Sequence, residues 1–384
     1  MIPYGRQDIT QEDIEAVVKI LHSDFLTQGP AVPVFEKKLC NYTGAKHAIV
    51  VNSCTAALHI ACLALGLGSG DILWTSAITF VASANCALYC GATVDFVDID
   101  PDTALMSVEK LEEKLILAEK EGKLPKIVIP VHFSGQSCDM REIYNLSQLY
   151  GFKIVEDAAH AIGAKYQNTP VGRGKYSDIT VFSFHPVKII TTGEGGAAIT
   201  NNPLYAEKME LLRSHGVSRD TAKMQNNIGE PWYYEQIELG FNYRMTDIQA
   251  ALGSSQLDRL DQYVSRRNEI AKWYNEHLNF EISNPLIQKT DRESACHLYV
   301  VRIMDSKHTR DEVFHSLREN DIGVNLHYIP VYRHPFFYTG NYLENAESYY
   351  KQAISLPIYP TINDKNLCRV VNCISSFQNN SLRV

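Results

Sequence analysis

The sequence predicts an α/β protein with a mostly parallel central sheet, followed by a smaller α+β domain. The first observation is that short apolar runs alternate with helical patterns of about 10–15 residues between residues 10 and 216. The second is that this alternation stops near residue 278. The third is the length of 384 residues, which at about 100–200 residues per domain favours two or three domains. A parallel sheet of this kind carries helices on both faces.

The first 216 residues supply the expected sheet. A helix begins after the capping-box-like pair Thr10 and Asp13, because apolar residues then recur at helical spacing. Strands are expected at 48–51, 72–74, 94–99, 127–131, 153–155, 178–184 and 197–200. The helices that separate the first five strands are expected at 55–65, 81–89, 107–119 and 140–150. This order favours parallel neighbouring strands.

The remaining residues predict a long helix and a second unit. Thr246-x-x-Gln249 opens a helical stretch that runs to about residue 278. Further elements are expected as strands at 297–303 and 324–332 and as helices at 310–320, 346–353 and 364–374. We therefore assign residues 1–250 to a large domain with an N-terminal arm. Residues 251–384 form the linking helix and a small C-terminal α+β domain, which itself begins near Leu278.

Composition and charge exclude several classes of protein. Hydrophobic residues make up 45% and charged residues 21% of the chain, so a disordered, collagenous or fibrous protein is excluded. The formal net charge of -8 gives no general attraction for nucleic acid or anionic lipid. No apolar run approaches the roughly 20 residues of a membrane-spanning helix. We therefore expect neither a nucleic acid nor a membrane as partner.

The cysteines and the N-terminal residues favour a cytoplasmic location. The nine cysteines are irregularly spaced, and no CxxC pair occurs. The N-terminal residues show no basic stretch followed by an apolar one, as a signal peptide would. We therefore expect reduced thiols in a cytoplasmic protein.

Polar side chains stand at the ends of expected strands, where open α/β sheets carry their chemistry. Glu156 and Asp157 follow one strand, and Ser183 ends another. Cys54 and Thr55 lie between a strand and the start of a helix. A helix start binds anions because free N–H groups and the helix dipole converge there. The alternative for this last segment is an ordinary N-cap cluster.

Lys188 stands in a mostly apolar loop directly after a strand that is expected to be buried. Removing water from an ammonium group lowers its pKa, which turns a lysine into an amine nucleophile. The alternative is a lysine whose charged end reaches solvent from the loop. The nearby Gly193-x-Gly195-x-x-Ala198 resembles a dinucleotide fingerprint, but a strand follows it where a helix is needed.

Several other catalytic patterns are absent from the sequence. There is no Walker A motif, no HExxH and no G-x-S-x-G, which counts against nucleotide hydrolysis, zinc proteases and α/β-hydrolases. His327 and His334 lie seven residues apart without a carboxylate cluster. We therefore expect no metal site.

Eight stretches of sequence stand out together. They are FLTQGP (25–30), VNSCTAALH (51–59), TSAITFVASANC (75–86), EDAAHAIGA (156–164), VFSFHPVKIITTGEGGAAIT (181–200), RSHGV (213–217), ELGFNYRMTDIQAALG (238–253) and SLPIYP (355–360). In this order they resemble the DegT/DnrJ/EryC1/StrS family of sugar aminotransferases across nearly the whole chain. The resemblance implies the type I, aspartate-aminotransferase-like fold of transferases that depend on pyridoxal 5'-phosphate (PLP).

The resemblance also assigns catalytic roles. Lys188 would bind PLP covalently and later carry a proton between the amino donor and the cofactor. Asp157 would pair with the pyridine nitrogen and keep it protonated, so that the ring accepts electrons. His160 would face the ring hydroxyl. Relatives that remove a hydroxyl group carry histidine where Lys188 stands, so lysine here counts against that branch.

Further residues would hold the cofactor by the same resemblance. Phe80 would stack on the ring face; the alternative for this residue is a core aromatic. Ser183, with Cys54 and Thr55 at a helix start, would bind the phosphate. Asn242 matches a position that reaches the phosphate from the neighbouring subunit, which implies a homodimer with two shared sites.

The implied substrates are a UDP-sugar and L-glutamate. SFHPVK (183–188), PWYYEQIELGFNYRM (231–245) and HYIPVY (327–332) are most like the branch that acts in pseudaminic acid biosynthesis. That branch aminates C4 of a UDP-linked 4-keto-6-deoxy-N-acetylhexosamine. The sugar-nucleotide pocket would be lined by Tyr4, Thr27, Cys54, Ser183, Asn242, Asn325, His327 and Tyr328.

Two alternatives stay open. Sister enzymes aminate another nucleotide-linked ketone, such as a UDP-pentose or a dTDP-hexose, and share nearly identical cofactor residues, so the fold does not decide between them. A noncatalytic PLP-binding sensor is the alternative from a different class. Such a protein would normally carry a DNA-binding segment, and this chain has no basic extension.

Overall fold

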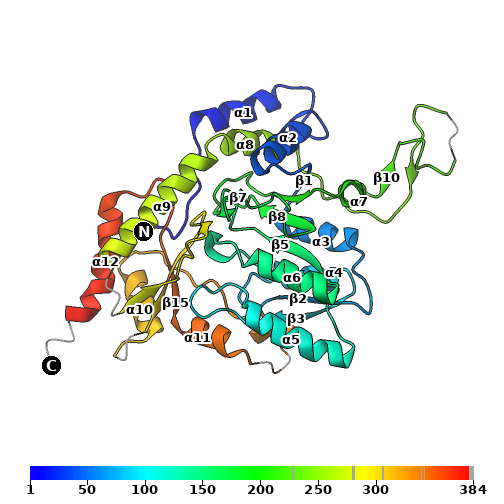
Figure 1. The fold of residues 1–384 in the computed structure, drawn as a ribbon. Coiled ribbons are helices and arrows are strands. Elements are labelled where there is room, and N and C mark those ends of the chain that lie inside the picture. The colour runs from blue at the N-terminus through cyan, green and yellow to red at the C-terminus, as the bar shows by residue number, and fades with distance from the viewer. Residues whose placement is uncertain (227–228, 279–281, 305–306, 339, 341, 380–384) are drawn as a thin grey trace.

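A seven-stranded sheet forms the centre of the computed structural model (Figure 1). The structure describes residues 1–226, 229–278, 282–304, 307–338, 340 and 342–379. Across the sheet the order is β1 (His47–Val51), β9 (Gly196–Thr200), β8 (Ile179–Ser183), β5 (Lys153–Asp157), β4 (Ile127–Ile129), β2 (Ile72–Ser76) and β3 (Thr93–Val97). Among these seven strands, β9 alone runs against its neighbours. The predicted α/β class with a mostly parallel sheet is confirmed.

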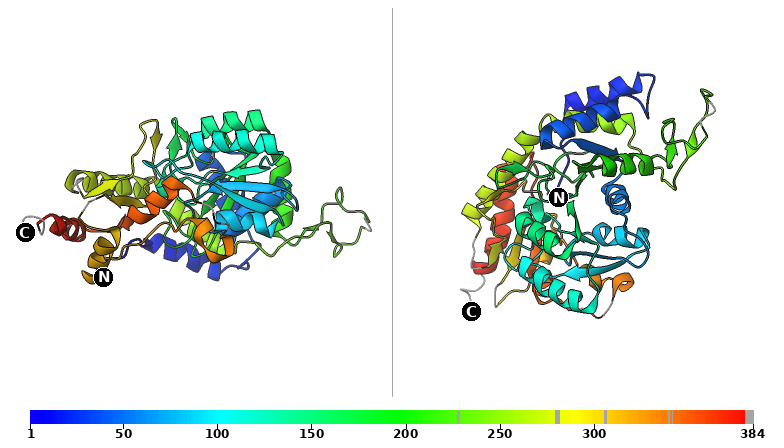
Figure 2. Two further views of the ribbon diagram at one scale, coloured as in Figure 1. Left: turned by 90° about the horizontal axis from the view of Figure 1, so that it is seen from below. Right: turned by 45° about the vertical axis from the view of Figure 1, so that its right-hand side comes forward.

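Helices cover both faces of this sheet (Figures 1 and 2). One face packs against α3 (Cys54–Ala64), α4 (Ala82–Tyr89) and α7 (Pro203–Arg213), and the other against α5 (Val108–Glu121) and α6 (Met140–Tyr150). Strand residues divide alternately between two apolar clusters: Leu73 and Val155 lie with α3, whereas Trp74 and Ile154 lie with α5 and α6. The four expected helices are confirmed to within a few residues, and α7 was not predicted.

Three helices from distant parts of the sequence pack together beside β1: α1 (Gln11–Leu21), α2 (Ala31–Thr43) and α8 (Asp247–Leu257). The predicted capping boxes are confirmed, because the Thr10 N–H donates to Asp13 Oδ2 at 3.0 Å and Thr246 pairs with Gln249 in the same way. The buried Asp13 carboxylate also accepts hydrogen bonds from Arg259 Nη2 at 2.7 and 2.6 Å.

The single long helix expected from residue 246 to 278 is wrong. Helix α8 ends at Leu257, the backbone departs from helical angles at Arg259 (φ -109°, ψ 6°), and a second helix, α9 (Leu260–His277), follows. Arg259 at this turn contacts Asp13, α8 packs on α1 and α2, and α9 continues toward the C-terminal sheet (Figure 1). Arg259 and Asp13 are 246 positions apart in sequence, so no local pattern reports their contact.

A three-stranded antiparallel sheet organises the C-terminal part. Its order is β12 (Ser283–Pro285), β14 (Tyr299–Ile303) and β15 (Ala353–Leu356). Helices α9, α10 (Arg310–Glu319) and α12 (Asp364–Asn379) share an apolar cluster with it, and α11 (Glu344–Gln352) precedes β15. The predicted α+β character is confirmed. The domain boundary at residues 250/251 stays a prediction, and residues 380–384, which it includes, lie outside the described residues.

The strand expected at 324–332 is wrong. Asn325 forms an isolated bridge with Ser355, and Val331–Arg333 is a 3-10 helix. Pro330 precedes this turn and has no N–H to offer a sheet. The Val331 N–H instead donates to Ala77 O, just after β2, at 3.0 Å, and residues 325–328 line the cavity described below.

The remaining strands are short and peripheral: β6 (Lys165–Tyr166), β7 (Thr169–Pro170), β10 (Val217–Ser218), β11 (Glu235–Gln236) and β13 (Arg292–Glu293). Strands β10 and β11 belong to a long arm that projects from the body of the protein (Figures 1 and 2). Trp232 and Leu239 on this arm are 69% and 76% exposed. None of the described helices combines the length and apolar character that a membrane span requires.

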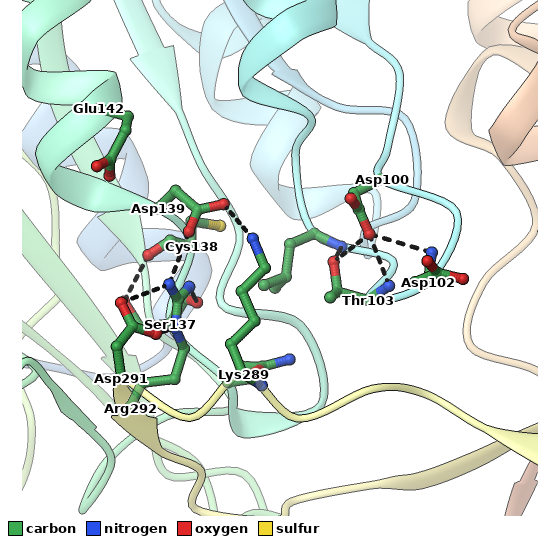
Figure 3. Close-up of polar contacts among 12 residues, drawn as sticks. Asp100, Asp102, Thr103, Ser137, Cys138, Asp139, Glu142, Lys289, Asp291 and Arg292 are labelled. Atoms are coloured by element: carbon green, nitrogen blue, oxygen red, sulfur yellow. Dashed lines mark hydrogen bonds and ion pairs between the residues drawn. The ribbon is translucent and has the colours of Figure 1, made fainter.

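An ion-pair network ties the segment before β14 to the start of α6 (Figure 3). Asp139 accepts hydrogen bonds from Lys289 Nζ at 2.7 Å and from Arg292 Nη2 at 2.6 Å, and Arg292 Nη1 donates to Ser137 O at 2.7 Å. Burial favours the protonated acid, but the two cations outweigh it and hold the pKa of Asp139 below its ordinary value. The network therefore fixes residues 289–292 against residues 137–139.

We expect Asp13→Asn to lower the free energy of unfolding by about 3 kcal/mol, because it leaves the largely buried Arg259 cation without its carboxylate. Burial opposes ionisation of Asp13, but hydrogen bonds led by Arg259 outweigh it and lower the pKa. The stabilisation is therefore complete above the unfolded pKa of about 3.9 and is lost as the pH falls through the lower folded value. Urea unfolding at neutral and acidic pH measures both effects.

The matched control for this prediction is Asp258→Asn. Asp258 pairs with Lys38 at 2.7 Å, but its side chain is 64% exposed, so we expect a loss of about 1 kcal/mol or less. Equal losses for the two variants would contradict a structural role of the buried pair.

Candidate active site

The carboxyl ends of β5 and β8 open into a cavity of about 600 Å³. The start of α3, the loop after β8 and the segment 325–328 form its other walls. Eleven residues singled out in the sequence line it: Tyr4, Cys54, Thr55, Phe80, Asp157, His160, Ser183, Lys188, Asn325, His327 and Tyr328. The fold thus brings residues from both ends of the chain into one site.

Lys188 lies in the turn after β8, where its N–H donates to His185 O at 2.9 Å. Its side chain lines the cavity, and Nζ makes no hydrogen bond or ion pair with any residue that the structure describes. Burial lowers the pKa of the Lys188 ammonium to about 8, against the opposing effects of Cys54 and Asp157. Near neutral pH, the amine is therefore unprotonated far more often than an ordinary lysine.

Asp157 ends β5 with its carboxylate held in a fixed orientation. Oδ2 accepts a hydrogen bond from Ser83 Oγ at 2.6 Å, and Oδ1 accepts one from the Ala159 N–H at 3.0 Å. Ser83 is itself within 2.8 Å of Thr79 Oγ1, so α4 and its preceding turn support the carboxylate. Such support fixes the direction in which the acid meets a ligand.

Glu156, the neighbour of Asp157, points to the opposite face of the sheet, as the two-residue period of a strand requires. It accepts hydrogen bonds from His132 Nε2 at 2.6 Å, from Thr180 Oγ1 at 3.0 Å and from Ser177. Burial favours the protonated acid, but these contacts outweigh it and lower the pKa of Glu156. Of this acidic pair, only Asp157 reaches the cavity.

The start of α3 forms the wall opposite the C-terminal segment. Ser53 Oγ accepts the Ala56 N–H at 3.1 Å, which leaves the earlier N–H groups of Cys54 and Thr55 without an intrahelical acceptor. Burial, with a smaller effect of Asp157, raises the pKa of the Cys54 thiol well above its ordinary value, which disfavours the nucleophilic thiolate form. Ser183, the last residue of β8, lines the same cavity as Cys54 and Thr55 at the start of α3.

Gly196 at the start of β9 sets the position of α3. A Cβ at this residue would lie 2.5 Å from Cys54 N and 2.7 Å from Cys54 Cα. Because real Cβ atoms do not approach backbone this closely, only glycine lets β9 lie against the start of the helix.

His160 has both ring nitrogens occupied by protein partners. Nδ1 accepts the Ser134 N–H at 3.3 Å, and Nε2 lies 3.2 Å from Tyr328 Oη. Burial, then the charges of Lys188 and His327, lowers the pKa of His160 well below its ordinary value. Its ring is therefore neutral at physiological pH, and its contact with a cofactor hydroxyl stays a prediction.

Two further imidazoles in the cavity are also neutral. Burial and Lys188 lower the pKa of His327 to about 3, and its Nδ1 is 2.8 Å from Ser355 Oγ. His297 packs against His160 with ring centroids 4.4 Å apart, and burial holds its pKa well below the ordinary value. Tyr4 covers the other side of His327, with ring centroids 5.5 Å apart.

Phe80 is not a core aromatic. Its side chain is 58% exposed although it lines the cavity, and its ring centroid lies 6.2 Å from that of Tyr328. A large apolar face left open beside a polar cavity is suited to a planar ligand.

Thr27 and Asn242 lie outside the cavity of this chain. Thr27 is exposed and forms a bridge with Thr246. Asn242 forms a bridge with Ser214, and its carbonyl accepts a hydrogen bond from Asn52 Nδ2 at 3.2 Å. Their roles toward a ligand stay predictions.

Sequence reasoning missed three residues of this site: Ser83, Ser134 and His297. Ser83 lies inside an expected helix, and His297 at the start of an expected strand. Each acts through a partner from a distant segment, so no motif or spacing could identify it.

Comparison with known proteins identifies the family. Residues 7–375 match the model of the DegT/DnrJ/EryC1/StrS aminotransferase family. The chain belongs to this family.

Two curated relatives and one solved structure support the assignment. A Campylobacter jejuni protein named UDP-4-amino-4,6-dideoxy-N-acetyl-beta-L-altrosamine transaminase is 40% identical over 374 residues, 95% of this chain and 94% of its own. The Bacillus subtilis spore coat polysaccharide biosynthesis protein SpsC is 39% identical over 385 residues, 97% of this chain and 96% of its own. Helicobacter pylori PseC, an aminotransferase involved in pseudaminic acid biosynthesis, superposes with a TM-score of 0.90 at 30% identity and covers 99% of both chains. The protein is a sugar aminotransferase of the PLP-dependent fold.

The cavity of this aminotransferase fits the cofactor that the family implies. It offers an amine at Lys188 that has no partner among the described residues, a carboxylate of fixed direction at Asp157 and an open aromatic face at Phe80. The start of α3 supplies N–H groups suited to a phosphate. These are the contacts that a phosphorylated pyridine aldehyde requires.

We expect Gly196→Ala to weaken PLP binding about tenfold or more, because its Cβ would push the start of α3 away from the cavity. Fluorescence titration of the cofactor-free protein measures the affinity. Gly68→Ala is the control, since no atom lies within 4 Å of the added Cβ, and its affinity should equal that of the wild type. Unchanged affinity in a folded Gly196→Ala protein would show that α3 does not bind the phosphate.

Proposed function

We propose that this protein is a homodimeric, PLP-dependent aminotransferase of pseudaminic acid biosynthesis. It transfers an amino group from L-glutamate to C4 of a UDP-linked 4-keto-6-deoxy-N-acetylhexosamine and forms UDP-4-amino-4,6-dideoxy-N-acetyl-beta-L-altrosamine. The names of two relatives support this substrate. The observation that carries the proposal is the desolvated amine of Lys188 in one cavity with the oriented carboxylate of Asp157.

Each cavity residue has a distinct task in this proposal. Bound PLP supplies an electron-accepting ring that makes the α-proton of an amino acid acidic. Asp157 would hold the proton on the ring nitrogen, with its carboxylate fixed in direction by Ser83. Lys188 would hold the cofactor, and its Nζ would carry the proton from the α-carbon of glutamate to the cofactor and, in the second half of the reaction, a proton from the cofactor to C4 of the sugar. The lowered pKa of Lys188 suits this proton transfer near neutral pH.

The segment 325–328 and Tyr4 form the wall that receives the sugar nucleotide. Because the imidazoles of His160 and His327 are neutral, they add no positive charge to the cavity beside Lys188. Phe80 and the neighbouring Tyr328 ring would limit the access of water to the face of the cofactor ring.

A cytoplasmic location remains our prediction for the protein.

The proposed homodimer follows from residues that lie outside the cavity. Asn242 forms a bridge with Ser214, which directly precedes the arm in sequence, and the arm itself exposes Trp232 and Leu239. Large apolar side chains on a projecting arm favour burial against another protein surface. A second copy would cover them and bring Asn242 to the partner's phosphate site.

Two alternatives differ in what the protein converts. The relative named for spore coat polysaccharide biosynthesis is similar at nearly the same identity, so a transaminase for another nucleotide-linked ketone is the first alternative. Incubation with glutamate and a panel of UDP- and dTDP-linked keto-sugars, with mass spectrometry and NMR of the products, decides between substrates. A noncatalytic sensor would bind PLP, but glutamate would not change the cofactor absorbance.

We expect Lys188→Ala to abolish turnover while the protein still binds pyridoxamine phosphate noncovalently, because only the amine is lost from the cavity. Steady-state assays with glutamate and the keto-sugar measure turnover, and a fluorescence titration measures binding. Lys175→Ala is the control, because this lysine lies over Tyr176 outside the cavity. Rapid multiple turnover by a verified Lys188→Ala protein would remove the assignment.

Hybrid dimers test the shared site. We expect Lys188→Ala and Asn242→Ala proteins each to lose activity as pure dimers. When the two variants are co-expressed with different tags, the mixture of dimers should have about a quarter of wild-type activity, because about half of the dimers are hybrids and each hybrid has one intact site of two. Hybrids purified by both tags should therefore have about half of wild-type activity. Purified hybrids with no more activity than either parent would show that Asn242 serves its own subunit.

A further inference from the structure

A strained turn behind the cavity fixes the position of one backbone N–H group. Ser134 has a φ of 62°, in the left-handed region that non-glycine residues rarely adopt. Its Oγ donates to Leu298 O at 2.7 Å, and the Leu298 N–H donates back to Ser134 O at 3.3 Å. A Cβ on the adjacent Gly135 would lie 2.9 Å from Cys296 N. The ion pairs in Figure 3 hold this same segment, 289–298, from its other end.

The turn aims the Ser134 N–H at His160. The contact with Nδ1 measures 3.3 Å, and a backbone N–H can only donate. Nδ1 is therefore the bare nitrogen of a neutral imidazole, and Nε2 carries the proton. Burial and the charge of Lys188 keep the pKa of His160 low, so a second ring proton is not bound at physiological pH.

The proton on Nε2 determines the direction of the next hydrogen bond. Tyr328 Oη lies 3.2 Å from His160 Nε2, so the hydroxyl oxygen accepts from the ring. Tyr328 Oη has no other hydrogen-bond partner among the residues that the structure describes, and the side chain lines the cavity. Burial raises the pKa of Tyr328, so the hydroxyl keeps its own proton. That proton is free to point toward a ligand.

We infer that Ser134 and His160 are positioning residues that make the Tyr328 hydroxyl a hydrogen-bond donor to an acceptor oxygen of the ligand in the cavity. With the opposite tautomer, Tyr328 would donate to His160 and offer the ligand nothing but lone pairs. The ligand named here rests on the proposed function. Its acceptor oxygen belongs either to the cofactor ring or to the keto-sugar, and the experiments below separate these two sources.

The tautomer is tested in the wild-type protein without any activity. Histidine labelled with ¹⁵N gives separate signals for protonated and bare ring nitrogens, and His160→Gln identifies the signals of residue 160 by their loss. We expect a protonated Nε2 and a bare Nδ1 at neutral pH. A protonated Nδ1, or a doubly protonated ring, would overturn the inference.

A double-mutant cycle tests the coupling between the two side chains. Tyr328→Phe and His160→Leu should each lower kcat/KM about tenfold, the value of one hydrogen bond to a ligand. The double variant should lose little more than either single variant, because both break one chain of contacts. Fully additive losses in proteins with unchanged thermal unfolding would contradict the chain.

His160→Gln separates positioning from packing. The glutamine side chain carries an amide oxygen that can accept the Ser134 N–H and an amide NH₂ that can donate to Tyr328. We expect it to recover most of the activity lost in His160→Leu, and the recovery should disappear when Tyr328→Phe is added. No recovery in a folded His160→Gln protein would count against the proposed direction.

The source of the acceptor oxygen follows from Tyr328→Phe. A weaker affinity for PLP, measured on the cofactor-free protein, places the oxygen on the cofactor; a raised KM for the keto-sugar with unchanged PLP affinity places it on the sugar. Unchanged values for both overturn the inference. If the wild type aminates none of the keto-sugars, the proposed function fails, but the tautomer and the PLP affinity still decide the inference.

Discussion

The site depends on keeping one amine out of bulk water beside a carboxylate that cannot turn away. Burial of Lys188 disfavours its charged form, and Asp157 and Cys54 offset this only in part. The amine has no partner of its own among the described residues, whereas the carboxylate is held by Ser83 and by the Ala159 N–H. This asymmetry leaves the lysine free to react and the acid restricted to one direction. The surrounding strands and helices maintain that difference.

The antiparallel direction of β9 keeps Lys188 near Asp157. A parallel continuation after β8 would carry the chain away to the far edge of the sheet through a crossover. Because β9 is antiparallel, residues 184–195 stay at the carboxyl edge, where Asp157 and Ser183 end their strands. Lys188 lies within this connection, and Gly196 begins β9 next to Val51, the last residue of β1. The close approach of Gly196 to Cys54 then sets the helix start against the same edge.

Much of the fold could be predicted from the sequence because its causes are local. The apolar run of β4 and the capping pair of Thr10 and Asp13 are visible in short windows, as are polar residues that follow strands. The break between α8 and α9 was not predictable, since Arg259 at this break binds the carboxylate of Asp13, which lies near the other end of the chain. The strand expected at 324–332 was wrong for a similar reason. Its conformation depends on contacts with a distant segment, such as the bridge between Asn325 and Ser355. Residues that orient others, such as Ser134, have no signature in sequence because the directing atom is a backbone N–H.

The electrostatics of the cavity bear on the proposed nucleotide-sugar substrate and on the proposed homodimer. Lys188 is the one lysine or arginine among the described residues that line it, and the imidazoles of His160, His297 and His327 are neutral. The chain as a whole carries a formal charge of -8. Oriented N–H groups at α3 suffice for one phosphate, but a sugar diphosphate brings further negative charge into a cavity that already holds Asp157. In the proposed homodimer, a second copy would bring Asn242 to this cavity as a further hydrogen-bond donor, and the hybrid dimers test whether it does so.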